Sequence, residues 1–311
     1  MLAGWAGAVL LSACAAHTPV LYVADRQADS VVVVDPETRK VLARIPDIPR
    51  PADLTVSPDG GTVYVGGEGR MVTAIRLPGR NLDRLEAGAV PQAVDVSPDG
   101  RALFVANAKD KTLSVISVKT GALLARARVG ALPIAVAAIP RRPAVYVVNY
   151  FSGTVSVVST ASYLVVATIP VGMFPVDIAL STDGRFAYVT NQRPGAVSVI
   201  DVARDTVVAT VAVGLNPVGI ASAPDGGTVY VANSGADTVS VVSTATDREE
   251  AVVPVGPSPW RVSVAPDGRR VYVTHRETDR IAVIDSESRQ VVAWLETGAA
   301  EGLMGIVVAP R

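Results

Sequence analysis

Hydrophobic and polar residues alternate along most of the chain with a period of two. Between residues 218 and 256, four short runs rich in Val, Thr and Tyr occupy 220–223, 228–232, 238–242 and 250–255. Such runs are typical of β-strands, because β-branched and aromatic side chains pack well on a pleated surface. Pro224-Asp225-Gly226 suits a tight hairpin between the first two runs, since proline fixes φ and glycine accepts a positive φ.

This unit recurs with a period of about 42 residues. An aromatic residue followed by Val marks each copy, and these aromatics are Tyr22, Tyr64, Phe104, Tyr146, Tyr188, Tyr230 and Tyr272. A turn that ends in Asp-Gly keeps the same step, and only the third copy departs, with Ile139-Pro140-Arg141-Arg142. Repetition of one supersecondary unit indicates a fold in which neighbouring copies bury one another.

Four antiparallel strands in about 42 residues are the signature of one β-propeller blade. The repeats begin at the second strand of a unit, at Tyr22, and end on the first strand of another, from Gly305 to Pro310. The sequence therefore predicts an all-β, seven-bladed β-propeller over residues 20–311, closed by one C-terminal strand that joins three N-terminal strands. Because closure protects the sheet edges, we expect the last ten residues to be essential for stability.

Three segments carry a family resemblance. Tyr188-Val189-Thr190-Asn191, Tyr230-Val231-Ala232-Asn233 and the Val-Gly-x-x-Pro run from Val213 to Pro217 resemble the YVTN family of β-propeller repeats. The resemblance covers about 290 of the 311 residues. It implies a propeller of the kind that is often a binding or accessory protein of the periplasm and cell surface.

The N-terminal segment indicates a targeting signal. Leu2 to Leu11 is apolar but far shorter than the ~20 residues of a membrane-spanning helix. Its continuation, Leu11-Ser12-Ala13-Cys14, resembles the lipobox of bacterial lipoproteins, which implies cleavage before Cys14 and acylation of Cys14. We expect a signal peptide at 1–13, a linker at 14–19 and an extracytoplasmic location, in the periplasm or at the outer surface. No Lys or Arg precedes the run, so an ordinary cleaved signal and a merely apolar N-terminus remain open.

Composition narrows the chemistry. Twenty-eight Lys and Arg against 29 Asp and Glu give a net charge of −1, which provides no global field for nucleic acid or an anionic membrane. A chain that is 49% hydrophobic is not disordered. One cysteine and two histidines leave little material for a metal centre, and neither a Gly-rich phosphate loop nor a nucleophile elbow is present. We expect no cofactor and no metal, and we assign no catalytic residue.

Departures from the repeat indicate a candidate site at the mouth of the central channel. Most copies place a small or apolar residue two positions after the proline that precedes each Asp-Gly turn, with Leu303 expected there in the closing blade. Charged and aromatic residues break this pattern, and a histidine replaces the repeat's Asn in one copy. Such groups could bind a small anionic or aromatic ligand. The predicted ligand-binding residues are Asp53, Asp177, Trp260, Arg261, His275 and Glu301.

Structural explanations compete with this site. Asp53 and Asp177 can accept backbone N–H bonds from a neighbouring blade, and Arg261 can pair with one of them. Trp260 can pack between blades, and a histidine on a solvated loop is more often inert than catalytic. The repeat's Asn, at 107, 149, 191 and 233, is expected to be a loop residue that adopts left-handed backbone and bonds nearby groups.

These features favour a non-enzymatic, lipid-anchored scaffold that binds a small molecule or an envelope protein. We expect a monomer, attached to the membrane by its lipid alone and without affinity for nucleic acid. Two alternatives remain: a hydrolase similar to lactonase propellers, and an accessory protein of a periplasmic cofactor or redox system.

Simple geometric observations separate these possibilities. Arg261, His275 and two carboxylates within hydrogen-bond reach, ~3 Å, would favour an enzyme. An exposed apolar rim around Tyr150, Phe174 and Trp260 would favour a partner surface. A basic groove of Arg50, Arg70 and Arg193 would favour nucleic acid.

Overall fold

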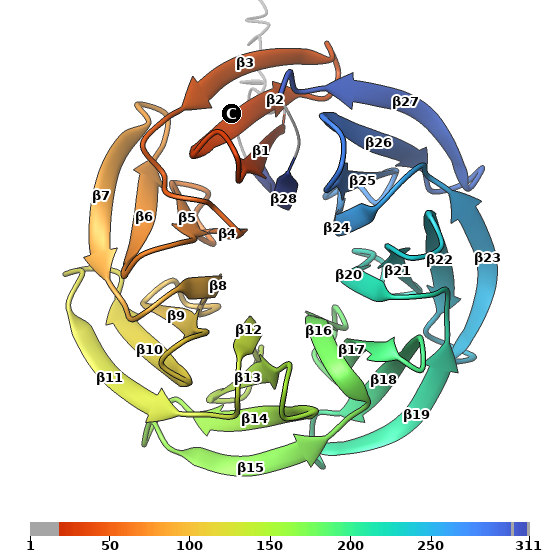
Figure 1. Cartoon of the computed structure of the whole chain (residues 1–311). Helices are drawn as coiled ribbons and strands as arrows, with labels where there is room; N and C mark the ends of the chain where they lie inside the picture. Colours follow the sequence, from red (N-terminus) through yellow and green to blue (C-terminus); the bar gives the residue numbers. More distant parts are fainter. Residues whose placement is uncertain (1–18, 300–301, 310–311) are drawn as a thin grey trace, which may run out of the picture.

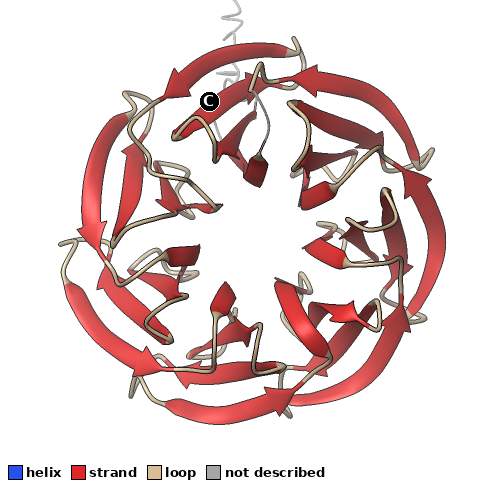
Figure 2. Cartoon of the chain, in the orientation of Figure 1, coloured by secondary structure: helices blue, strands red, loops and turns tan. Residues whose placement is uncertain are grey.

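Seven four-stranded antiparallel sheets form a ring in the computed structural model, which describes residues 19–299 and 302–309 (Figure 1). Every regular element among the described residues is a strand (Figure 2). This part of the chain contains no helix of the length and hydropathy that crossing a membrane requires. The predicted all-β, seven-bladed propeller is confirmed.

The strands take four radial positions. The innermost strands are β4 (Asp53–Val56), β8 (Pro91–Val96), β12 (Pro133–Ala138), β16 (Met173–Leu180), β20 (Pro217–Ser222), β24 (Pro259–Val264) and β28 (Leu303–Ala309). The second strands are β1 (Val20–Asp25), β5 (Thr62–Gly66), β9 (Ala102–Asn107), β13 (Ala144–Asn149), β17 (Phe186–Arg193), β21 (Thr228–Asn233) and β25 (Arg270–His275). The third strands are β2 (Ser30–Asp35), β6 (Met71–Arg76), β10 (Thr112–Ser117), β14 (Thr154–Ser159), β18 (Ala196–Asp201), β22 (Thr238–Ser243) and β26 (Arg280–Asp285). The outermost strands are β3 (Lys40–Ile45), β7 (Asn81–Glu86), β11 (Leu123–Arg128), β15 (Val165–Pro170), β19 (Thr206–Ala212), β23 (Arg248–Pro254) and β27 (Gln290–Glu296).

The ring closes as the sequence predicts. One sheet has the order β28-β1-β2-β3, so a single C-terminal strand completes a blade whose other three strands are N-terminal. In its register, Val20 lies opposite Ala309 and Tyr22 opposite Val307. Figure 1 shows β28 beside β1, where the two ends of the colour scale meet.

Burial changes with radial position. Both middle strands of the closing blade, β1 and β2, are buried at every residue, whereas the outer strand β19 alternates between exposed positions and partly or fully buried ones. The middle strands are covered on both faces by neighbouring blades, and the outer strand presents one face to solvent. This difference explains the continuous Val runs of the middle strands and the alternating pattern of the outer ones.

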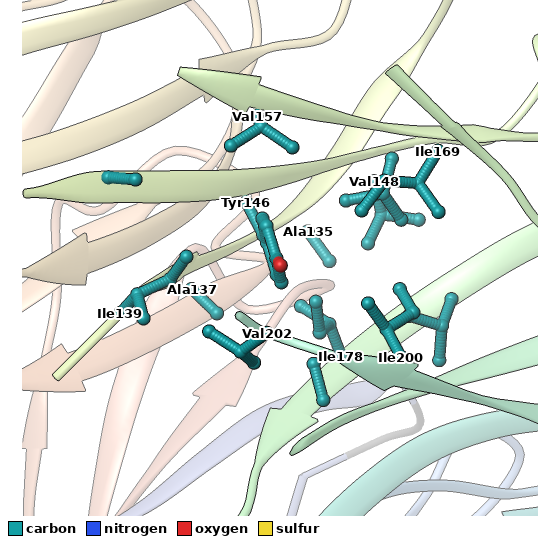
Figure 3. Packing of buried hydrophobic residues seen from close by; sticks show 14 residues of the cluster. Ala135, Ala137, Ile139, Tyr146, Val148, Val157, Ile169, Ile178, Ile200 and Val202 are labelled. Carbon is teal, nitrogen blue, oxygen red and sulfur yellow. The ribbon is translucent and has the colours of Figure 1, made fainter. Parts of the chain in front are cut away.

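The hydrophobic core is divided among the interfaces between neighbouring blades. In one cluster, Tyr146 and Val157 of the β12–β15 blade pack with Ile178 and Ile200 of the next blade (Figure 3). Each such side chain contributes about 1.5–3 kcal/mol when it is fully buried. Since every blade has two such neighbours, no blade buries its faces alone.

Loops fall on two faces of the ring. The loops that lead into each innermost strand and those that join second to third strands lie on one face, which we call the mouth face. The remaining hairpins, including the Pro-Asp-Gly turns, lie on the other, which we call the turn face. In one of these turns Asp59 Oδ1 accepts bonds from Ser57 Oγ at 2.5 Å and Gly61 N at 2.9 Å, and Gly60 has a φ of 72°.

We predict that truncation after Gly302, which removes β28, abolishes cooperative folding. Leu303, Met304, Ile306 and Ala309 are all buried. Their burial contributes about 5–8 kcal/mol, comparable with the whole stability of a domain. Thermal unfolding followed by circular dichroism tests this, and a truncated chain that melts within a few degrees of the full chain would show that closure by β28 is dispensable.

Candidate functional site

The innermost strands carry four ionisable residues: Asp53, Asp95, Asp177 and Arg261. Each aspartate accepts a backbone N–H bond from the innermost strand of the next blade. Asp53 Oδ2 lies 3.1 Å from Val94 N, and Asp177 Oδ2 lies 3.1 Å from Ile220 N. Asp53 and Asp177 therefore make the bonds to a neighbouring blade that the structural explanation expects.

Asp95 makes the same bond but is absent from the predicted site. Its Oδ2 lies 2.8 Å from Ala138 N, and its Oδ1 accepts a bond from Thr55 Oγ1 at 3.3 Å. Asp95 lies four positions after Pro91, where the other complete repeats have only small side chains. That departure from the repeat was the signal that could have identified it.

Burial alters the ionisation of two of these carboxyls. Burial raises the pKa of Asp53 to about 6, against a partial opposing effect of Arg261. Burial also raises the pKa of Asp95 to about 6, although its bonds to Ala138 and Val96 act in the opposite direction. Both groups titrate near neutral pH as part of the joints between blades.

Arg261 pairs with Asp177 from a blade two positions away around the ring. Nη1 of Arg261 contacts Oδ2 of Asp177, and the two side chains are only 12% and 15% exposed. Burial lowers the pKa of Arg261, but Asp177 and Asp53 outweigh this effect and raise it overall, so the guanidinium stays charged. Its Nε is buried and has no hydrogen-bond partner among the described residues.

Two threonines hold the backbone at this ion pair. Thr190 Oγ1 accepts a bond from Asp177 N at 3.0 Å and donates to Val218 O of the next blade at 2.8 Å. Thr274 Oγ1 does the same between Arg261 N at 3.0 Å and Met304 O at 2.8 Å. The Tyr-Val-Thr sequence is present only in these two copies, so the threonine marks the blades that carry the ion pair.

His275 lies in the body of its blade. It is fully buried, with Nε2 2.7 Å from Val255 O and Nδ1 3.2 Å from Arg280 O, and the Trp294 ring packs at 5.5 Å. Burial lowers its pKa, which keeps the ring neutral. A neutral ring has a single N–H, so Nε2, at the shorter distance, donates to Val255 O while Nδ1 only lies near Arg280 O. His275 is fully buried at the connection between two blades and is not exposed to a ligand.

The recurrent asparagines were expected in left-handed loop conformations, and that expectation is wrong. Asn107, Asn149 and Asn233 each end a strand, are fully buried and have negative φ. The Nδ2 of Asn233, for example, donates to Thr238 Oγ1 at 3.1 Å and Ser240 Oγ at 2.7 Å. A Cβ on Gly214 would lie 2.6 Å from that amide, so the asparagine packs beneath the glycine that connects two blades.

The expected position of Leu303 also needs correction. Leu303 lies opposite Asp25 in the register, as Pro217 lies opposite Asn233, so Leu303 occupies the proline position of the repeat. The residue two positions further on is Gly305, where a Cβ would lie 2.9 Å from the Cα of Asp53. Glycine is required there because the innermost strands approach one another closely.

Aromatic residues gather on the mouth face. The Tyr150 ring centroid lies 5.2 Å from those of Phe151 and Phe174, and Tyr150 Oη donates to Gln192 Oε1 at 2.9 Å. Arg193 lies 5.9 Å from the Phe174 ring. Phe151 is 66% exposed, and Met173 and Leu215, on the same face of the next two blades, are 59% and 61% exposed.

Trp260 has a mixed role. It packs against the core cluster beneath the closing blade, while the Arg276 guanidinium lies 4.9 Å from its ring centroid. Tyr150, Phe174 and Trp260 are each only partly exposed, and Trp260 lies three blades from Tyr150, so the expected exposed rim around these three residues remains a prediction. The more exposed apolar side chains on the mouth face are Phe151, Met173 and Leu215, which the sequence did not single out.

The remaining candidates are placed as follows. Arg50 Nε lies 3.0 Å from Glu68 Oε2, so its charge is neutralised locally and does not join Arg193 in a basic groove. The predicted residues Cys14 and Glu301 lie outside the described residues.

Comparison with known proteins identifies one matching family over part of the chain. Residues 144–263 match the model of the family described as "Cytochrome D1 heme domain". No curated protein matches the chain. The matched segment contains Tyr150, Phe174, Asp177 and Arg261.

Several solved structures share the propeller fold. A chain of hydrazine synthase from Kuenenia stuttgartiensis has 19% sequence identity and a TM-score of 0.74, over 84% of this chain and 95% of that one. A functionally unknown protein from Desulfotomaculum acetoxidans DSM 771 has 16% identity and a TM-score of 0.82, over 94% and 99%. Dihydro-heme d1 dehydrogenase NirN in complex with DHE has 18% identity and a TM-score of 0.65, over 93% and 74%. At these identities the likeness establishes the fold.

The residues at the centre of the ring do not suit a haem. The described part of the chain contains one histidine, His275, which is fully buried within its blade and therefore offers no axial ligand to the channel. The innermost strands carry three aspartates and one arginine, an excess of negative charge that disfavours the carboxylates of a tetrapyrrole. The similarity therefore concerns the scaffold.

We predict that Thr190→Val destabilises the protein by about 1–3 kcal/mol, because Asp177 N and Val218 O both lose a buried partner. Thr210→Val, at an exposed position of β19, is the control and should change stability by less than about 0.5 kcal/mol. Urea unfolding measures both, and equal effects would contradict the role given to Thr190.

A second prediction concerns pH. Because the folded-state pKa values of Asp53 and Asp95, about 6, exceed the ordinary 3.8, protonation favours the folded state. Their contribution to stability is fully present below the unfolded pKa and is lost as the pH rises through about 6. Asp95→Asn keeps an acceptor for Ala138 N and removes the ionisable group. The free energy of unfolding of the variant, measured relative to wild type, should therefore be higher at pH 8 than at pH 4.5 by on the order of 1–3 kcal/mol. Stability curves of the variant and wild type that run parallel with pH would refute this.

Proposed function

We propose that this protein is a non-enzymatic scaffold that docks a protein partner through the mouth face. The observation that carries the proposal is the exposure of Phe151, Met173 and Leu215 on three consecutive blades, beside the Tyr150 and Phe174 rings. Large exposed apolar side chains grouped on one face mark interaction sites. Aromatic residues, Met and Arg are the types enriched in protein interfaces.

The inner ring supports the same conclusion. Asp53 and Asp95 join neighbouring blades, Asp177 pairs with Arg261, and His275 is buried among carbonyls. A general base must reach a substrate proton, and His275 is enclosed. The charged groups that a hydrolase would need are used to hold the blades together, which disfavours the lactonase-like alternative.

We further propose that the partner belongs to an extracytoplasmic cofactor or redox system. The segment that matches the haem d1 family, 144–263, is the segment that carries the exposed side chains. Because the inner ring does not suit haem, the cofactor would reside on the partner. The extracytoplasmic location rests on the Leu11–Cys14 motif alone.

Site-specific photocrosslinking tests this function. A benzophenone amino acid at position 151 should crosslink one envelope protein, and Leu215→Ser should weaken that product at least tenfold, as loss of a central interface side chain does. Leu164, on the turn face, is 64% exposed and matches Leu215 at 61%, so Leu164→Ser is the control and should have no effect.

The crosslinked product separates the two parts of the proposal. A benzophenone amino acid at position 164 is the matching control for the crosslinker position, and crosslinking from 164 equal to that from 151 would refute docking through the mouth face. A single partner that carries no cofactor would retain docking and refute the redox assignment.

A further inference from the structure

A cavity of about 760 Å³ opens on the turn face at the closing blade. The cavity results from the way in which the ring closes. In the other blades a Pro-Asp-Gly or related hairpin joins the two inner strands, but β28 and β1 come from opposite ends of the chain. The turns of the two flanking blades, at 59–61 and 265–267, therefore stand on either side of a space that none of the residues 19–299 and 302–309 fills, and a volume of this size is typical of small-molecule sites.

Apolar groups form much of its lining. Leu77 and Pro78 come from the blade on one side, Val308 and Ala309 from β28, and Pro266 from the blade on the other side. This surface would bury the apolar body of a ligand.

Tyr272 supplies an unused polar group. Its side chain is 4% exposed and lines the cavity, and among the described residues its hydroxyl has no hydrogen-bond partner. Among the described residues the Tyr188 and Tyr230 hydroxyls are likewise without a hydrogen bond, whereas the equivalent Tyr146 donates to Asp205 Oδ1 at 2.5 Å. Burial raises the pKa of Tyr272 to about 12, so the hydroxyl keeps its proton.

Acidic side chains outnumber basic ones around the cavity. Glu37, Asp59 and Asp267 lie in its lining, and Arg270, the cation among them, is paired with Asp285. Bonds from Ser57 and Gly61 lower the pKa of Asp59, which keeps that carboxylate ionised. Opposite-charge attraction thus favours a cation here.

We propose that this cavity binds a small organic cation with an apolar body. The body packs on Leu77, Pro78 and Val308, while the cationic group faces the carboxylates and the Tyr272 hydroxyl. This second site goes beyond the docking function, because it lies on the opposite face of the ring.

A matched set of biphenyl probes tests the site on the purified full-length protein. 4-Phenylbenzylamine, 4-phenylbenzyl alcohol and biphenyl-4-carboxylate share a body and differ in charge. Isothermal titration should give the order amine, alcohol, carboxylate, with the amine about tenfold tighter than the carboxylate. Absence of amine binding at millimolar concentration, or equal binding of amine and carboxylate, would overturn the proposal.

Variants localise the binding. Glu37→Gln and Asp267→Asn should each weaken the amine about threefold, and Tyr272→Phe should weaken all three probes. Asp225→Asn changes the equivalent Pro-Asp-Gly turn of a blade that does not line the cavity, so it is the matched control. An equal effect of Asp225→Asn and Asp267→Asn, in variants with unchanged melting temperature, would also overturn it.

Discussion

The structure depends on burial between neighbouring blades. Each sheet has two apolar faces, and the side chains that cover them belong to the blades on either side, as Tyr146 and Ile200 illustrate. A stack of this kind stabilises all of its members only when it closes, because an open ring would leave one face of two blades in water. The pairing of β28 with β1 therefore supports every other interface in the molecule.

This constraint decides what the polar residues near the centre do. Innermost strands converge, so their backbone N–H groups need partners where few strands can pair. Asp53, Asp95 and Asp177 supply carboxylate acceptors from one blade to the next, and Thr190 and Thr274 add hydroxyl bridges. Buried polar groups in such a ring must be satisfied, which makes them structural before they can be functional. Function is then left to the loops, whose side chains closure does not require.

The two faces differ accordingly. The mouth face exposes Phe151, Met173 and Leu215 within the segment that matches the haem d1 family model, and this is the surface through which we propose that a partner docks. On the turn face the closing blade has no hairpin between its two inner strands, and the pairing of two distant strands leaves a cavity next to Tyr272. Closure by a C-terminal strand thus both stabilises the ring and leaves this cavity.

The sequence by itself determined the architecture. A two-residue alternation within a repeat of about 42 residues specifies four strands per blade and seven blades, because strand period and turn chemistry are local properties. It also marked Asp53, Asp177 and Arg261 as departures, and it left open whether they bind ligand or join blades. Only the tertiary structure showed that they join blades, that Asp95 acts with them, and that His275 and the recurrent asparagines are buried beneath the connections between blades. These outcomes depend on which residues face each other across blades about 42 positions apart or at opposite ends of the chain, and such contacts are set by ring closure and not by local pattern.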